Sequence, residues 1–236
     1  MTTFEAEITR LNITRLCHLT PLINLVHILA GEGLRSSKDL GADERACFDP
    51  QDLLRLDGYP DHISCSIEYP NAWYLRRRRS DATPEQRLAP DWVCILIAPE
   101  WLAHPDTRFC ANNAARFRGA LIGQGIGAFT EMYSSPIDSA RGLLPRSSNR
   151  LQCCPTDDQA EVLVPRGVPL ADIRGIACAS EEQAKRVYWG LRQNGAAIDH
   201  LQFTFAPDIF NAQRLSALMR AGARPAETEF AGSPDG

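Results

Sequence analysis

Apolar residues recur at helical spacing directly after a short alternating segment near the start of the chain. In the range 22–29, leucine, isoleucine and valine side chains repeat every three or four residues, which predicts a helix with one wide apolar face. Thr20 is a suitable N-cap for this helix, and Pro21 suits its first position. Gly31 and Gly33 predict its end, one of them in the left-handed conformation.

Other segments have the patterns of short strands and further helices. A continuous apolar run at 92–97 predicts a buried strand, and the alternation at 62–68 predicts another. Further strands are expected at 159–164, 173–178 and 201–205, and helices at 72–79, 181–194 and 210–223. Because strands and helices do not alternate regularly, these elements predict a mixed α+β fold rather than a doubly wound sheet.

The composition indicates one globular unit. Hydrophobic residues make up 44% of the 236 residues and charged residues 23%, which is usual for a globular domain. We expect one domain over 1–223 and a flexible tail over 224–236, where glycine and proline recur. No apolar run is long enough to span a bilayer, and the polar first residues do not resemble a signal peptide, so a cytoplasmic protein is expected.

Charge and cysteine usage narrow the functions further. With a net charge of −4, any nucleic-acid-binding surface must be local. None of the eight cysteines stands in a Cys-x-x-Cys pair, so neither a zinc site nor a disulfide framework is expected, and we predict no metal.

The segment before the first helix carries the first candidate site. His18 and Thr20 stand two residues apart, so on a strand their side chains share one face. A ring nitrogen and a hydroxyl beside a helix N-terminus suit a polar, planar, partly anionic ligand. The alternative is that His18 is a hydrogen-bonded core histidine and Thr20 only a helix cap.

A carboxylate in an apolar strand is the second candidate. Glu161 lies among alanine, valine and leucine residues, directly after a long connection over 130–155. Such a carboxylate is costly unless it is paired or functional, and a connection of this length is unusual without a functional reason. The alternative is an edge-strand glutamate that faces water.

Arginine residues provide the local basic surface. A run of four arginines over 76–79 follows Trp73 and Tyr74, a combination that suits phosphate contact and base stacking. The alternative is a solvated helix face. The residues expected to contact nucleic acid are Arg76, Arg77, Arg78, Arg146 and Arg150.

One formal motif is rejected. Gly123-x-Gly125-x-x-Ala128 matches the dinucleotide fingerprint, but Pro136 follows too soon for the helix that this fingerprint requires.

Three stretches together resemble the DarT family, toxin ADP-ribosyltransferases that modify bases in single-stranded DNA with NAD. The first is His18-Leu19-Thr20 followed by Asn24-Leu25, Ile28-Leu29 and Gly33-Leu34. The second is the strand-to-helix piece 63–74, and the third is Gln159-Ala160-Glu161-Val162-Leu163-Val164. The resemblance implies an ADP-ribosyltransferase-like fold, with a central split mixed sheet and flanking helices. It also implies a macrodomain antitoxin as partner, within a toxin–antitoxin or phage-defence system.

The resemblance also implies site roles. His18, Thr20 and Asn24 would hold the nicotinamide end of NAD, and Glu161 would be the catalytic carboxylate. Tyr69 or Tyr74 would stack on the nicotinamide. The loop before the glutamate would read the target base, thymine or guanine. Arg55, with Arg45 as the alternative, would be the catalytic arginine.

Two other functions are also compatible with these motifs. The chain could modify protein or RNA instead, including as a relative of RNA 2′-phosphotransferases. It could also be a degenerate module that binds NAD or DNA without catalysis.

Overall fold

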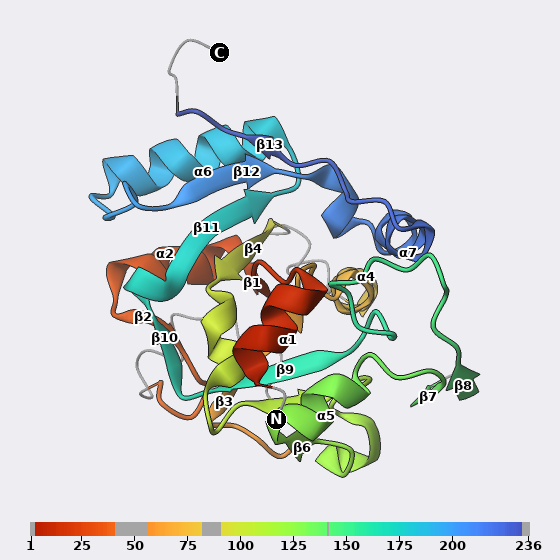
Figure 1. Cartoon of the computed structure of the whole chain (residues 1–236). Helices are drawn as coiled ribbons and strands as arrows, with labels where there is room; N and C mark the ends of the chain where they lie inside the picture. The colour runs from red at the N-terminus through yellow and green to blue at the C-terminus, as the bar shows by residue number, and fades with distance from the viewer. Residues whose placement is uncertain (1–2, 41–55, 82–90, 141, 233–236) are drawn as a thin grey trace.

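Within the described part of the chain, a nine-stranded mixed sheet organises the fold (Figure 1). The computed structural model describes residues 3–40, 56–81, 91–140 and 142–232. The sheet has the strand order β13-β12-β11-β4-β1-β3-β9-β5-β6. Its strands are β1 Leu16–Pro21, β3 His62–Ile67, β4 Trp92–Ile97, β5 Arg108–Cys110, β6 Gly123–Gln124, β9 Glu161–Pro165, β11 Ile173–Cys178, β12 Gln202–Phe205 and β13 Thr228–Glu229. β11 and β12 run parallel, while the other strand pairs among the described residues are antiparallel, so the expected mixed α+β fold is confirmed.

Helices and two small sheets surround this sheet. In Figure 1, α6 runs along β11 and β12, and α4 lies beside α7. The helices are α1 Phe4–Leu11, α2 Leu22–Ala30, α4 Ala72–Asp81, α5 Gly125–Glu131, α6 Glu181–Gln193 and α7 Ala212–Ala221. Short 3₁₀ turns span Pro99–Ala103, Arg116–Gly119, Leu170–Asp172 and Pro207–Phe210. The small sheets pair β2 Gly33–Arg35 with β10 Gly167–Pro169, and β7 Ile137–Ser139 with β8 Gly142–Leu144.

The position of β4 in the hydrophobic core explains why its sequence is entirely apolar. Every residue of β4 is buried, because β4 is paired with β1 on one side and with β11 on the other and is covered on both faces. A strand in this position has no polar face, which is why its sequence is a continuous apolar run.

The sheet divides between β1 and β3. Among the described residues, these strands pair only at Leu16 with Ile67 and at Cys17 with Ser66. One residue further along β1, the His18 Nδ1 atom lies 2.9 Å from the Ser64 carbonyl oxygen. A side-chain contact thus replaces the backbone ladder, and the separation of the two strands makes room for a cavity.

The expected start of α2 is wrong by one residue. The helix begins at Leu22 with Pro21 as its N-cap, and no side chain caps it. Thr20 remains in β1, where its hydroxyl oxygen accepts a hydrogen bond from Asn24 Nδ2 at 3.2 Å. Gly31, the C-cap, is extended, whereas Gly33 has a φ of 121°. The backbone of Gly33 also passes so close to β10 that a Cβ there would lie 2.2 Å from the Val168 carbonyl oxygen.

The segment from residue 224 is anchored, contrary to the expected flexible tail. β13 pairs with β12, and Glu227 forms an ion pair with Arg15. Arg224 forms another, at 2.8 Å, with the buried carboxylate of Glu68. Residues 224–232 are therefore part of the fold.

No helix in the described ranges combines the length and apolarity that a membrane crossing requires.

Candidate active site

A cavity of about 420 Å³ opens where β1 and β3 separate. Its volume lies within the range of small-molecule sites. Its walls come from β1, α2, β3, α4, the segment 113–115 and the start of β9. The lining includes His18, Thr20, Asn24, Ser64, Ser66, Asn71, Tyr74, Arg77, Arg78 and Glu161.

β1 and α2 supply polar groups to one wall. The Ser64 carbonyl oxygen can only accept a hydrogen bond, so His18 must carry a proton on Nδ1 in this contact. When the ring is neutral, its other nitrogen, Nε2, is therefore an acceptor. Thr20 and Asn24 are buried and joined by the hydrogen bond between their side chains. The strand-to-helix turn thus presents three polar side chains to one cavity, which goes beyond the structural roles considered for His18 and Thr20.

Glu161 is held by two donors at the cavity wall. It is the first residue of β9, which lies between β3 and β5 and is therefore not an edge strand. The Ser64 hydroxyl donates a hydrogen bond to its Oε2, and the Ala114 backbone N–H donates to its Oε1 at 2.9 Å. A carboxylate fixed at both oxygens has a defined direction, unlike a glutamate that simply faces water.

Of the two tyrosines expected near the nicotinamide, only Tyr74 lines the cavity. Its ring meets Trp92 edge to face, and Asn71 caps the start of α4 by accepting from the Tyr74 backbone N–H at 3.0 Å. Tyr69 is buried in the core with the Arg15 guanidinium over its ring, and burial raises the pKa of its hydroxyl. The structure therefore does not bring Tyr69 into the site.

The arginine run divides by position on α4. Arg77 and Arg78 line the cavity, whereas Arg76 is exposed and lies over the Trp73 ring. Two of the three expected basic residues on this helix thus belong to the cavity wall.

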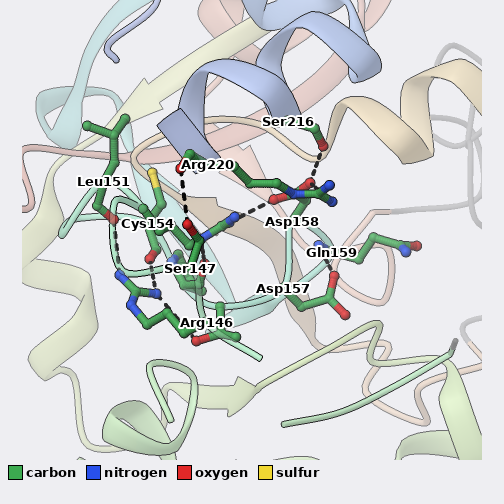
Figure 2. Close-up of polar contacts among 12 residues, drawn as sticks. Arg146, Ser147, Leu151, Cys154, Asp157, Asp158, Gln159, Ser216 and Arg220 are labelled. Atoms are coloured by element: carbon green, nitrogen blue, oxygen red, sulfur yellow. Dashed lines mark hydrogen bonds and ion pairs between the residues drawn. The ribbon is translucent and has the colours of Figure 1, made fainter. Parts of the chain in front are cut away.

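Arg146 and Arg150 hold the connection before β9 together and do not line the cavity. Figure 2 shows Arg146 with its partners. Arg146 is half-buried and donates to the carbonyl oxygens of Leu151 at 3.0 Å and Cys154 at 2.8 Å. Arg150 is buried and pairs with Asp158 at 2.7 Å. The nucleic-acid role expected of these two arginines does not fit their placement, because their guanidinium groups are already engaged inside the fold.

Asp158 joins this connection to two helices. Its second carboxylate oxygen accepts from the Ser216 hydroxyl on α7, as Figure 2 shows, and Ser216 in turn accepts from Trp73 Nε1 on α4 at 3.1 Å. Burial alone would raise the pKa of Asp158, but Arg150 and Ser216 outweigh burial and lower it. The chain that leads to Glu161 is therefore fastened to the helix that carries Tyr74 and the cavity arginines.

The residues that position Glu161 are not identifiable from the sequence alone. Ser64 and Ser66 alternate within β3, which signals a polar face, but nothing local pairs Ser64 with a glutamate 97 residues away. The short strand β5, which precedes Ala114, is not among the strands expected from the sequence. Arg55 and Arg45, the alternatives for the catalytic arginine, lie outside the described residues.

The cysteines contribute packing. Seven cysteines in the described part of the chain are free and buried, including the adjacent Cys153 and Cys154. Within that part, no group of three or more histidine, cysteine or acidic side chains could hold a metal ion.

A family model described as "ssDNA thymidine ADP-ribosyltransferase, DarT" matches residues 17–210, which is most of the chain and includes the whole cavity. No curated protein matches.

Solved structures of DarT proteins have a similar fold. Thermus sp. 2.9 DarT in complex with NAD⁺ is 17% identical with a TM-score of 0.56, covering 84% of this chain and 97% of that one. The same protein in complex with ADP-ribosylated ssDNA is 15% identical with a TM-score of 0.55, covering 80% and 93%. Thermosipho africanus DarTG in complex with ADP-ribose is 14% identical with a TM-score of 0.54, and the match covers 84% of this chain and 51% of that one. The present chain thus spans about half the length of the Thermosipho chain. The chain belongs to the DarT family.

Proposed function

We propose that this protein is an NAD-dependent ADP-ribosyltransferase that modifies a base in single-stranded DNA. The observation that carries the proposal is Glu161, oriented by two donors, in one cavity with His18, Thr20 and Asn24. The family is described as acting on thymidine in single-stranded DNA, which favours thymine over guanine as the target.

The polar wall of β1 and α2 suits the nicotinamide end of NAD. A carboxamide and a ribose offer both donors and acceptors, and His18, Thr20 and Asn24 can match them. Tyr74 supplies an aromatic face for the pyridine ring. Arg77 and Arg78 supply positive charge for the diphosphate or for the DNA backbone.

The transfer breaks one glycosidic bond and forms another. Nicotinamide leaves with the bonding electron pair, so positive charge develops on the ribose. The carboxylate of Glu161 stabilises this charge beside the ribose hydroxyls. A nitrogen of the base then bonds to the ribose carbon and gives up its proton, which Glu161 accepts as a general base.

Water must be kept from the ribose cation, or NAD would only be hydrolysed. The connection before β9 is suited to this task, since Arg146 and Arg150 hold it in a compact form beside the glutamate. We assign the reading of the target base to this connection as well. The catalytic arginine is assigned to Arg55, with Arg45 as the alternative.

The biological setting is also proposed. A DNA-modifying enzyme of this family acts as a toxin in the cytoplasm, where NAD and single-stranded DNA meet. A macrodomain antitoxin of the DarG type would neutralise it by removing the modification.

The experiment that tests the function is mass spectrometry of short single-stranded oligonucleotides incubated with the protein and NAD. We expect one added ADP-ribose on oligonucleotides that contain thymine, and none on matched sequences without it. Fragmentation of the product identifies the modified base. Consumption of NAD with no adduct on any DNA, but with adducts on RNA or protein, would assign a different acceptor.

Ser64→Ala tests how Glu161 is positioned. The substitution removes the donor to Oε2 and keeps the Ala114 N–H as donor to Oε1. A hydrogen bond to a charged group contributes enough that we expect kcat to fall by about 10- to 100-fold, with little change in KM for NAD. Ser64→Thr keeps a hydroxyl and should restore most of kcat. Equal kcat in Ser64→Ala and wild type would contradict this role.

A further inference from the structure

An exposed aromatic side chain stands beside the cavity and has no role in the chemistry above. Phe117 is 64% exposed, in the turn between β5 and β6. Phe117 and Arg118 both have left-handed backbones, with φ values of 49° and 54°, and Gly119 follows with a φ of 83°. Left-handed residues other than glycine are uncommon, and such outliers concentrate at functional sites.

The Phe117 turn, defined here as residues 115–119, lies at the rim of the cavity. On its N-terminal side, Ala115 lines the cavity and follows Ala114, which donates to Glu161. On its C-terminal side, Gly119 is pressed against the backbone of Asp57, another lining residue; a Cβ at Gly119 would lie 2.1 Å from the Asp57 oxygen. Both ends of the turn are thus attached to the cavity wall.

Arginine residues precede and follow Phe117 in the sequence. The Arg116 guanidinium lies over the Phe117 ring, 4.9 Å from its centroid, and donates to the Asp138 carbonyl oxygen at 3.3 Å. Arg118, the residue after Phe117, is exposed. A ring held in this way loses little freedom when a ligand stacks on it. Aromatic and basic groups side by side are the combination that single-stranded nucleic acid requires.

We propose that Phe117 stacks on a base next to the modified nucleotide, and that Arg118 contacts the adjoining phosphate. This inference rests on the proposed function, and it adds a binding subsite outside the cavity. Stacking on a ring does not depend on base identity, so the subsite increases affinity for the strand without selecting its sequence. The target base itself would be selected inside the cavity.

The test compares Phe117→Ala with wild type by fluorescence anisotropy on a labelled thymine-containing oligonucleotide. We expect the Kd for DNA to rise by roughly 10-fold, because alanine removes one stacked base contact. The KM for DNA in the transfer assay should rise in parallel, whereas the thermal shift produced by NAD should not change. Phe117→Trp keeps the aromatic face and should bind DNA as wild type does.

Two further variants test whether DNA binding depends on the aromatic ring and the arginine charge, rather than on any exposed apolar side chain. Leu143 is 74% exposed on the β7–β8 hairpin, so Leu143→Ala removes an equally accessible apolar side chain and should leave the Kd unchanged. Arg118→Gln should weaken binding and lower the slope of log K against log salt by about one.

The possible results distinguish the inference from the proposed function. If wild type modifies DNA and Phe117→Ala binds and modifies it equally well, the inference is wrong and the function stands. If wild type binds DNA more tightly than Phe117→Ala but transfers no ADP-ribose to it, Phe117 contacts the strand as inferred, but the proposed function is wrong and there is no modified nucleotide beside it. Absence of single-stranded DNA binding by wild type overturns both.

Discussion

Glu161→Gln is expected to reduce ADP-ribosyl transfer to DNA by at least about 1,000-fold. The amide has the size of the carboxylate and keeps an oxygen that can accept from Ser64 or Ala114. It has no negative charge to stabilise the ribose cation, a loss that alone costs about 100- to 1,000-fold. It also cannot take the proton of the base, and general bases contribute a further factor of about 100 or more. The measurement is kcat/KM for transfer to an oligonucleotide.

The matched control for this variant is Glu100→Gln. Glu100 is an exposed glutamate of the 3₁₀ turn Pro99–Ala103, outside the cavity, so the same chemical change there should leave transfer within twofold of wild type. Both variants should unfold at the temperature of the wild type within a few degrees. Transfer by Glu161→Gln within 10-fold of wild type would assign the chemistry to another residue.

Arg150→Met is expected to lower the free energy of unfolding by about 3 to 5 kcal/mol. Arg150 and Asp158 are buried partners, with side chains 3% and 8% exposed. Methionine fills much of the arginine volume, but it removes the closer cation of the buried Asp158 carboxylate and leaves it with Arg220 at 3.8 Å. It also removes the donor to the Pro155 carbonyl. Urea unfolding followed by circular dichroism measures the difference at neutral pH.

Arg186→Met is the control for this second variant. Arg186 also pairs with an aspartate, Asp91, but both side chains are largely exposed, at 58% and 42%. Exposed pairs contribute little, so this variant should lose less than about 1 kcal/mol. Equal losses in the two variants would show that burial does not determine the contribution of the Arg150 pair.

The effect of Arg150→Met depends on pH in a defined direction. The pKa of Asp158 is lower in the folded protein than in the unfolded chain. Its pairing therefore stabilises the fold above the unfolded pKa of about 3.9, and this stabilisation is lost as the pH falls through the folded pKa. The difference between wild type and Arg150→Met should accordingly narrow below about pH 4. A difference that stays constant down to pH 2.5 would contradict the ionic origin of the effect.

The sequence by itself determined the local elements and the main chemical groups of the site. The helical spacing over 22–29, the apolar run over 92–97 and the alternation over 62–68 each correspond to an element of the structure. These patterns are readable because they arise from contacts between neighbours in the chain and from burial of one face. The resemblance at His18-x-Thr20 and at Glu161 was equally local, and it identified the family that the family model also matches.

Only the tertiary structure decided which of the candidate residues meet. Ser64 and Ala114 reach Glu161 across 97 and 47 residues, through a strand order that no local pattern encodes. Arg150 has the sequence features of a surface arginine, yet it is buried and pairs inside the fold with Asp158, which also accepts from Ser216. Tyr69 and Tyr74 are equivalent candidates in the sequence and lie in different environments in the structure. Contacts of this kind depend on how distant segments pack, so no local sequence pattern reveals them.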